Sequence, residues 1–306
     1  MSVITSQKIT SYYDRFKTVE VTFSREIVKV TGLVTKQVYL KCGGDIWPCV
    51  VYAASFEGAK VAANVQAGLM SKLEQAKNTV SLRFCFQKPD TDGPVTFFVS
   101  ARVSGQSPHG ESKDTVLFSL QYTQRPPDDL IEIMGRVLDA NVNAGKRKND
   151  RIDLNPEVIR KLNLVTKDTA IYIQGVPRRC MVRDISFSGS KLIMLGVAKF
   201  LINREASLRL DFDDPRENFL IKGIFIRAEE VAGRKELLAL ALEFAENEIP
   251  MGYKIRINEY LGQPRNDSKG RAPEDAPASA PVPASAPAPV SAPGVPEPPA
   301  EGQDKL

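Results

Sequence analysis

The chain has 306 residues, a formal net charge of +4 and 42% hydrophobic residues, values that are typical of a globular protein. So small a charge excludes a surface built throughout for a polyanion, so any basic site must be local. No apolar run approaches the ~18 residues that a membrane span needs, and the N-terminus lacks the apolar centre of a signal peptide. The composition therefore predicts a cytoplasmic protein without a membrane span.

The residues that metal and acid–base chemistry need are scarce. His109 is the only histidine and lies in a Gly/Ser/Pro loop, which argues against a zinc centre and against histidine catalysis. The sequence also contains no phosphate loop and no GxSxG. We therefore predict that the protein is not an enzyme and has no catalytic residue, metal or cofactor. Without a CxxC pair, four thiols are predicted to be buried and reduced: Cys42, Cys49, Cys85 and Cys180.

Residues 1–125 are predicted to form a first small antiparallel barrel. A helix is expected over 6–16, with Ser6 as a possible cap. A second helix is expected over 64–77, because its apolar residues recur at helical spacing. Alternating apolar residues between turn signals predict strands over 18–23, 25–30, 36–42, 47–52, 80–86, 95–103 and 115–122.

Residues 126–145 are predicted to be a linker helix. Pro126 and Pro127 end the first unit, and Asp128 can cap a helix with an apolar stripe. Residues 146–263 are predicted to form a second barrel, with a final helix over 251–261. Its strands are expected over 169–175, 179–186, 190–196, 206–212, 219–230 and 237–246. The Pro/Ala/Ser-rich tail, 264–306, has too few large apolar residues for a core and is predicted to be disordered.

The two units resemble each other in sequence. Residues 49–60 align without gaps to 180–191, with six of twelve positions identical, and VSLRFCF at 80–86 matches ASLRLDF at 206–212. Two matches in the same order predict a duplicated barrel. The first unit has Ala53 where the second has Asp184, and no arginine pair precedes it. We therefore predict that the first barrel is a copy without the ligand groups.

Two short motifs of the second unit carry the candidate site. Arg147 and Arg151 lie four residues apart in KRKNDR, and Asp184, Ser186 and Gly189 lie in DISFSG. Arginine offers a planar fork of donors that binds phosphate oxygens and stacks on flat rings. An aspartate, a hydroxyl and a glycine on a turn supply short polar groups and room for a ligand. Together the motifs predict a site for an anionic, aromatic ligand such as a nucleotide.

These motifs resemble the RxxxR and (D/N)xSxxG pair of the PilZ domain family, and every defining position is matched. The resemblance covers about residues 146–259 well and the first unit more weakly. It implies a mainly β protein of two small six-stranded antiparallel barrels, the first degenerate, joined by the helical linker. It also implies a bacterial receptor that binds the second messenger cyclic di-GMP and performs no chemistry on it. At the position of Lys146, the family residue influences whether one ligand molecule or a stacked pair binds.

The roles of the ligand-binding residues follow from the resemblance and from residue type. Arg147 and Arg151 are expected to pair with phosphate oxygens and to stack on or hydrogen-bond a guanine. Asp184 can accept hydrogen bonds from guanine N1–H and the amino group. Ser186 offers a small donor and acceptor, and Gly189 permits close approach of a ligand to the backbone.

The position of the arginine pair directly after the linker helix predicts how the receptor signals. Binding is expected to reorient the barrels or to expose a surface for a protein partner, with motility or virulence as outputs by family analogy. Two alternatives stay open: a scaffold with a vestigial ligand site, and a nucleic-acid patch made of Lys146, Lys148, Arg178 and Arg179.

Overall fold

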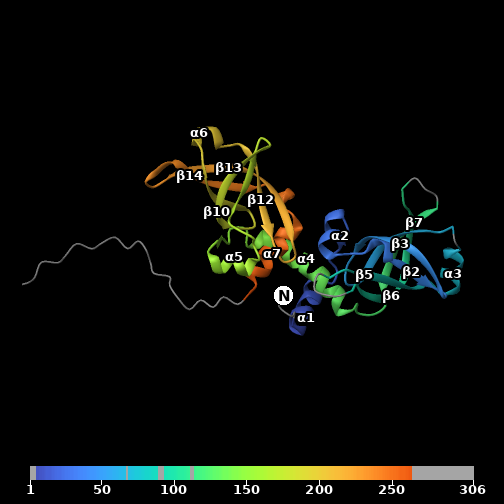
Figure 1. The fold of residues 1–306 in the computed structure, drawn as a ribbon. Helices are drawn as coiled ribbons and strands as arrows, with labels where there is room; N and C mark the ends of the chain where they lie inside the picture. Colours follow the sequence, from blue (N-terminus) through green and yellow to red (C-terminus); the bar gives the residue numbers. More distant parts are fainter. Residues whose placement is uncertain (1–4, 67, 89–92, 111–113, 264–306) are drawn as a thin grey trace, which may run out of the picture. The chain divides into compact units, whose positions relative to one another are not determined.

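The computed structural model describes residues 5–66, 68–88, 93–110 and 114–263. In these ranges the chain is mainly β, and its elements can be followed by colour in Figure 1. The tail for which disorder is predicted, 264–306, lies outside the described residues. The described part therefore tests the two predicted barrels and the helix between them.

The first barrel consists of six antiparallel strands that close on themselves. Their order is β3-β2-β5-β6-β7-β4, and β4 pairs back to β3. A two-residue strand, β1, adds to β3 from outside this ring. The strands are β1 (Val21–Thr22), β2 (Tyr39–Cys42), β3 (Asp45–Ala54), β4 (Gly58–Asn64), β5 (Thr79–Phe86), β6 (Val95–Pro108) and β7 (Thr115–Tyr122).

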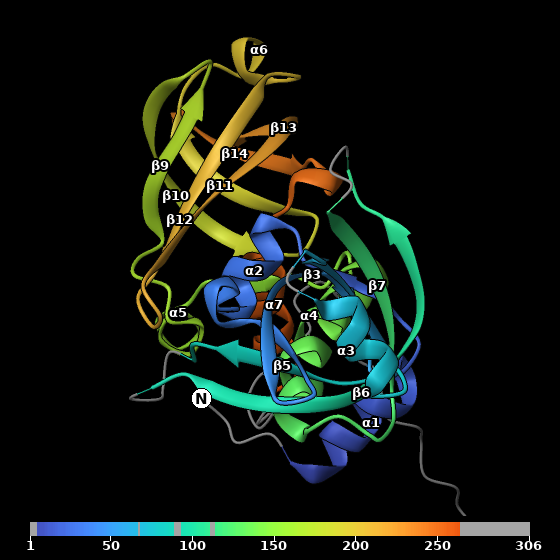
Figure 2. The same ribbon diagram turned by 90° about the vertical axis from the view of Figure 1, so that its right-hand side faces the viewer.

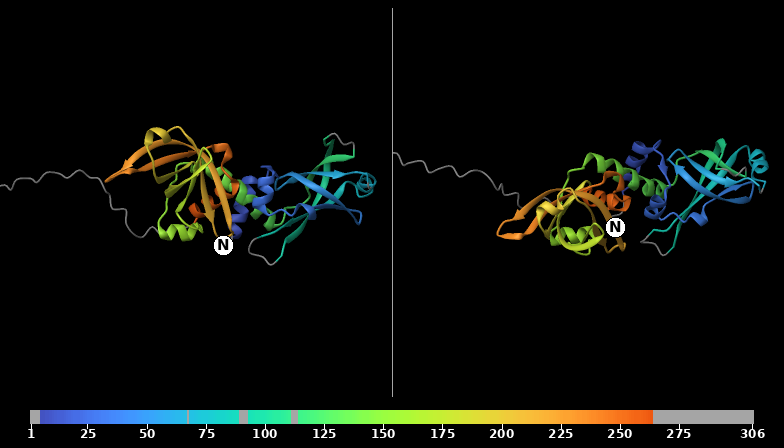
Figure 3. Two further views of the ribbon diagram at one scale, coloured as in Figure 1. Left: turned by 45° about the horizontal axis from the view of Figure 1, so that its top comes forward. Right: turned by 90° about the horizontal axis from the view of Figure 1, so that it is seen from above.

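The second barrel repeats this arrangement strand for strand. Its order is β10-β9-β12-β13-β14-β11, β11 pairs back to β10, and the short β8 adds to β10. The right-hand view of Figure 3 looks along this barrel, whose green and yellow strands curve into a ring. The strands are β8 (Ile152–Asp153), β9 (Asp168–Ile173), β10 (Val176–Ile185), β11 (Gly189–Leu195), β12 (Glu205–Phe212), β13 (Glu217–Val231) and β14 (Arg234–Phe244). The predicted fold of two six-stranded antiparallel barrels is confirmed.

Irregularities recur at equivalent places in the two barrels. The pairing of β3 with β4 shifts between Val51 and Ala53, and that of β10 with β11 shifts between Val182 and Asp184. Isolated bridges join Leu33 to Phe86 in the first barrel and Leu164 to Phe212 in the second. A bulge adds one residue to one strand of a pair and re-aims the side chains beside it. Both barrels therefore have a β-bulge directly before the equivalent residue, which is Ala53 in the first barrel and Asp184 in the second.

Seven α-helices accompany the strands in the described ranges. They are α1 (Ser6–Phe16), α2 (Arg25–Thr31), α3 (Leu69–Gln75), α4 (Asp128–Lys146), α5 (Pro156–Leu162), α6 (Ala198–Leu201) and α7 (Met251–Leu261). The cap of α1 is Thr5, whose Oγ1 accepts from Lys8 N, so the assignment of Ser6 was wrong. The helix predicted over 64–77 is only α3, because Asn64 ends β4. None of the described helices is long and apolar enough to cross a membrane.

The strand predicted over 25–30 was wrong, because this segment is helix α2. Local start and stop signals outweigh the β-branched residues that suggested a strand. Ser24 Oγ accepts from Ile27 N at the N-terminus, and Gly32 ends the helix with φ +71°. A side chain at Gly32 would also lie 2.2 Å from Gln87 O. Helix α5 takes the equivalent place in the second barrel, with Asn155 as its cap.

Helix α4 connects the two barrels and packs on helices from both ends of the chain. It contacts α1, α2 and α7, and Figure 2 shows these helices in one view. Most of its buried residues join the core of the first barrel, while Ala144 packs against the core of the second. Gly135 fits against the ring of Tyr12, where a Cβ would approach within 2.3 Å. The linker helix runs one residue beyond the predicted boundary and includes Lys146.

Candidate ligand-binding site

The structure brings the second arginine of the first motif onto the aspartate of the second motif. Arg151 immediately precedes β8, which pairs with the end of β10 so that Asp153 is opposite Asp184. Arg151 Nη1 lies 2.6 Å from Asp184 Oδ1. The two motifs, although more than thirty residues apart, therefore form one charged cluster at the closing seam of the second barrel.

Hydrogen bonds to one carboxylate oxygen, Oδ1, and to the main-chain carbonyl fix the position of Asp184. Its carboxylate is 9% exposed, and Oδ1 accepts from Lys191 N at 3.1 Å as well as from Arg151. Ser190 Oγ donates to the Asp184 carbonyl at 2.8 Å. Oδ2 accepts no hydrogen bond from any other residue in the described ranges. The fixed carboxylate thus keeps one oxygen for a further donor.

Arg147 lies at the end of α4 and faces a different neighbour. It is the C-terminal cap of the helix, and its Nε pairs with Asp150 Oδ2 at 2.8 Å. Its Nη1 donates to the carbonyl of Leu261, the last residue of α7, at 3.2 Å. The structure therefore places the two arginines on two different acidic partners, and only Arg151 contacts Asp184.

Ser186 builds the turn that carries the second motif. Its Oγ accepts from Gly189 N at 3.1 Å and from Ser188 N at 3.3 Å, inside the barrel wall. In the first barrel Ser55 Oγ accepts from Gly58 N at the same distance. A serine that closes a turn in both copies has a folding role that needs no ligand. The sequence suggested only the ligand role.

Gly189 also has a packing role. A Cβ at this position would lie 2.5 Å from the carbonyl oxygen of Leu242 on β14, and one at Gly58 would lie 2.3 Å from that of Leu120 on β7. The glycine therefore admits a neighbouring strand in each barrel. The residues that distinguish the second barrel are those that the first lacks, namely the arginine pair and Asp184.

The first barrel carries the opposite charge where Arg151 stands in the second. Strand β1 pairs with β3 as β8 pairs with β10, so that Glu20 occupies the place of Arg151. Glu20 forms an ion pair with Lys60 at 2.8 Å. An acidic residue beside Ala53 disfavours an anionic ligand. Sequence reasoning missed Glu20, although aligning the short strand before each bulge could have identified it.

Two further contacts fasten the arginine segment, residues 147–151, to its surroundings. Ser188 Oγ donates to the carbonyl of Lys148 at 2.8 Å, and Lys148 Nζ pairs with Glu246 at 3.1 Å. Lys146 is exposed at the end of α4. Sequence reasoning missed Ser188, which occupies a variable position of its motif and contacts a main-chain oxygen.

Tyr253 of α7 supports the turn from inside the barrel. Its ring is fully buried, and its Oη donates to the Ser186 carbonyl at 2.7 Å. Burial first, and then the charge of Asp184, raise the pKa of the Tyr253 phenol above its usual value. The hydroxyl therefore stays a donor at neutral pH.

We expect Tyr253→Phe to destabilise the second barrel by about 1–3 kcal/mol, because it leaves a buried carbonyl without its donor. Tyr122→Phe is the matched control, since Tyr122 Oη is buried and has no hydrogen-bond partner in the described ranges. That control should be neutral or slightly stabilising. Urea unfolding of both variants tests the difference, and equal losses would contradict the assigned role.

The four cations of the alternative nucleic-acid patch are divided between two places. Lys146 is the last residue of α4, and the Lys148 carbonyl accepts from Ser188 of the motif turn. Arg178 and Arg179 lie near the start of β10, and the five residues from Arg179 to Asp184 span ~17 Å of extended chain. The geometry therefore gives no single basic surface that combines all four.

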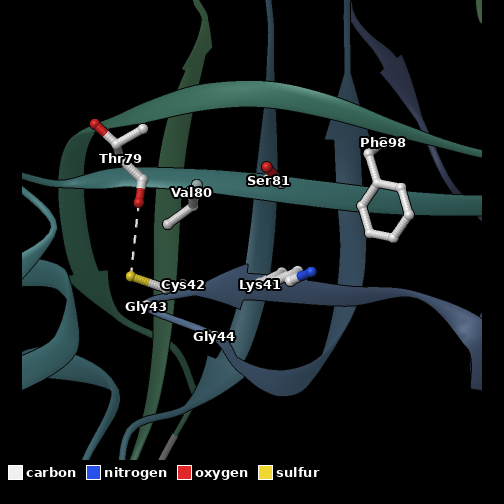
Figure 4. Close-up of a pocket in the computed structure, with 8 residues that line it drawn as sticks. All are labelled: Lys41, Cys42, Gly43, Gly44, Thr79, Val80, Ser81 and Phe98. Atoms are coloured by element: carbon white, nitrogen blue, oxygen red, sulfur yellow. Dashed lines mark hydrogen bonds between the residues drawn. The ribbon is translucent and has the colours of Figure 1, made fainter.

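Two hollows among the described residues do not include the motif residues Arg147, Arg151 and Asp184. One of about 340 Å³ lies in the first barrel, between Lys41 and Phe98, and Figure 4 shows its residues. There Cys42 Sγ donates to the Thr79 carbonyl at 3.6 Å, and burial raises the pKa of the thiol. A second, of about 440 Å³, borders Arg183 on the strand that carries Asp184. The charged cluster itself lies on the barrel surface.

Known proteins resemble this chain over most of its length. A family model described as the PilZN3 domain matches residues 7–141. A protein of Treponema denticola named cyclic di-GMP binding protein is 42% identical over 286 residues, which cover 92% of this chain and 91% of that protein. A match of this length includes most of both barrels.

Two solved structures are also similar. Borreliella burgdorferi PlzA in complex with c-di-GMP is 22% identical, with a TM-score of 0.37, over 83% of this chain and 98% of that one. Escherichia coli YcgR in complex with c-di-GMP is 12% identical, with a TM-score of 0.27, over 77% and 86% of the two chains. Because both TM-scores are below 0.5, the family assignment rests on the Treponema denticola relative.

Proposed function

The chain belongs to the PilZ protein family, and on this premise we propose that it is a receptor that binds cyclic di-GMP at its second barrel. The observation that carries the proposal is the convergence of Arg151 on Asp184 at 2.6 Å. The first barrel has Glu20 and Ala53 at the equivalent places. The same barrel fold therefore exists without these charged groups, so a ligand explains them better than folding does.

The residue types suit the ligand. Guanidinium groups bind phosphate oxygens through paired hydrogen bonds and stack on guanine rings, which assigns these roles to Arg147 and Arg151. Asp184 Oδ2 can accept from the N1–H and amino group of a guanine. Ser186 and Gly189 shape the turn. No group in this set has to transfer a proton or form a bond, so the proposed function is binding without catalysis.

Binding is proposed to proceed by exchange of ion pairs. Each arginine already has an acidic partner, Asp184 for Arg151 and Asp150 for Arg147. The Arg147–Asp150 pair is partly exposed on both sides, so it contributes little to stability and a phosphate can replace Asp150 at modest cost. The Arg151–Asp184 pair contributes more, because the Asp184 carboxylate is only 9% exposed, although Arg151 itself is half exposed to an incoming phosphate.

The contact between Arg147 and Leu261 suggests the route of the output. If a phosphate accepts the hydrogen bonds of the Arg147 guanidinium, the Leu261 carbonyl at the end of α7 loses its donor. The same two helices are joined by an Asn143–Asn258 hydrogen bond of 2.8 Å, and Asn258 donates to Asp139. Loss of the Arg147–Leu261 hydrogen bond would remove one of these polar contacts and so alter how α4 and α7 pack. Reorientation of the barrels, or exposure of a surface for a protein partner, is the proposed signal.

The proposed location is the cytoplasm. All four cysteines are buried and unpaired, and burial raises the pKa of the Cys49 and Cys180 thiols to about 12. Free thiols of this kind fit a reducing compartment.

Isothermal titration calorimetry of the full chain tests the binding proposal. Cyclic di-GMP should give a saturable heat. Cyclic di-AMP should bind at least ~30-fold more weakly, because adenine has no N1–H and no amino group at C2, the two donors from which Asp184 would accept hydrogen bonds. A parallel titration with single-stranded DNA tests the nucleic-acid alternative. In that case the affinity for DNA would fall steeply as the salt concentration rises. No heat with cyclic di-GMP would overturn the proposal.

Small-angle scattering with and without saturating cyclic di-GMP tests the output. A change in the scattering curve supports reorientation, whereas identical curves would leave only the exposure of a local partner surface.

A further inference from the structure

Lys191 occupies the same structural position in the second barrel as Lys60 in the first. Both are cross-strand partners of the residue after the bulge, Asp184 in one case and Ala53 in the other. Paired residues of an antiparallel ladder present their side chains on the same face of the sheet. Lys191 therefore rises beside the carboxylate that holds Arg151, on the strand that follows the second motif.

The charge facing this lysine differs between the barrels. In the first, Lys60 Nζ lies 2.8 Å from Glu20, which stands where Arg151 does in the second. In the second, the guanidinium of Arg151 and the backbone N–H of Lys191 both contact Asp184 Oδ1. The carboxylate that neutralises the lysine in the first barrel is thus replaced by a second cation.

Lys191 has no acidic side chain as an ion-pair partner in the described ranges. It is half-buried and takes part in none of the ion pairs found in the described ranges. Its partner on β14 is Ala241, and the acidic residues diagonal to it, Glu243 and Asp153, are exposed and form no ion pair with it. Lys191 and Arg151 therefore face one location, in which Asp184 is the ion-pair partner of Arg151 and Lys191 Nζ has no ion-pair partner of its own in the described ranges.

We propose that Lys191 Nζ binds a phosphate oxygen of cyclic di-GMP together with Arg151, as a ligand-binding residue outside both motifs. Two cations on one face attract a phosphodiester more strongly than either alone, and a phosphate oxygen relieves their mutual repulsion. The contact with Asp184 uses the Lys191 main chain, so the side chain is free for this role. The inference rests on the proposed function.

Calorimetric titration of four variants of the full chain with cyclic di-GMP tests the assignment. Lys191→Met keeps the apolar stem and removes the charge, and it should weaken binding about 10-fold, as loss of a charged hydrogen bond predicts. Lys191→Arg should bind within about 3-fold of the unsubstituted protein, because it keeps the cation. Lys60→Met is the matched control in the first barrel, and Arg151→Ala is the reference for loss of the site.

A salt series separates a phosphate contact from a structural effect. Because screening weakens only charged interactions, the affinity of Lys191→Met should fall less between 50 and 300 mM NaCl than that of the unsubstituted protein. Thermal unfolding checks that each variant is folded; if Lys191→Met is not, Lys191→Gln replaces it.

The outcomes keep this inference distinct from the proposed function. If the unsubstituted protein does not bind, the proposed function fails. If it binds and Arg151→Ala does not, while Lys191→Met binds normally with unchanged salt dependence, only the role of Lys191 is overturned. Equal losses in Lys60→Met and Lys191→Met would also overturn it, because the effect would not be local to the site.

Discussion

Replacing Arg147 and Arg151 together by alanine should weaken cyclic di-GMP binding by at least ~100-fold, because each charged hydrogen bond contributes about 1.5–3 kcal/mol. Each single variant should lose roughly 10-fold or more on the same grounds. Calorimetric titration of the three variants measures the effect. Arg178→Ala is the matched control, since Arg178 is exposed at the other end of β10, and its affinity should be unchanged.

The two single variants should differ in stability. Arg151→Ala removes the side-chain partner of Asp184, a carboxylate that is only 9% exposed, and should lower the melting temperature of the second barrel by a few degrees. Arg147→Ala separates partly exposed groups and should change it little. Normal binding by the folded double variant would contradict the proposed site.

Gly189→Ala should destabilise the second barrel by at least about 2 kcal/mol, because the new Cβ meets a main-chain oxygen that cannot move independently. The new Cβ would lie 2.5 Å from Leu242 O on β14, the strand that pairs with β11. Gly58→Ala should destabilise the first barrel in the same way, since its Cβ would lie 2.3 Å from Leu120 O. Differential scanning calorimetry measures both losses.

Gly145→Ala is the control for this pair. Gly145 lies in α4 with open space around its Cβ position, so alanine there should stabilise by up to about 1 kcal/mol. Cyclic di-GMP should bind folded Gly58→Ala with normal affinity, because that glycine serves the barrel without ligand groups. If Gly189→Ala were as stable as the unsubstituted protein and lost only binding, the glycine would serve the ligand instead.

The barrels could be predicted from sequence because their strands alternate strictly between turn signals. The failures occurred where a short segment carries its own caps. Residues 25–30 combine β-branched residues with Ser24 and Gly32, and the caps prevail because they satisfy the helix ends. Helix α5 was missed for a related reason, since Asn155 and Pro156 start a helix directly after a two-residue strand.

The charged residues of the candidate site could be identified from sequence, but not all of their partners. Arginine spacing and DxSxxG are local patterns, so the sequence alone identifies Arg147, Arg151 and Asp184. The bond from Tyr253 to the Ser186 carbonyl joins positions far apart in the chain and depends on how α7 enters the barrel. The packing role of Gly189 depends on the approach of β14, which no spacing encodes.

The hydrogen bond from Ser188 to Lys148 has a consequence for the speed of the receptor. With α4 at one end, β8 at the other and this bond between them, the arginine segment keeps its main chain in place. Capture of a ligand then requires rotamer changes, which take picoseconds to nanoseconds, and no folding of the segment. Association should approach the rate of diffusional encounter, so the lifetime of the complex would decide how soon the signal ends when the messenger is removed.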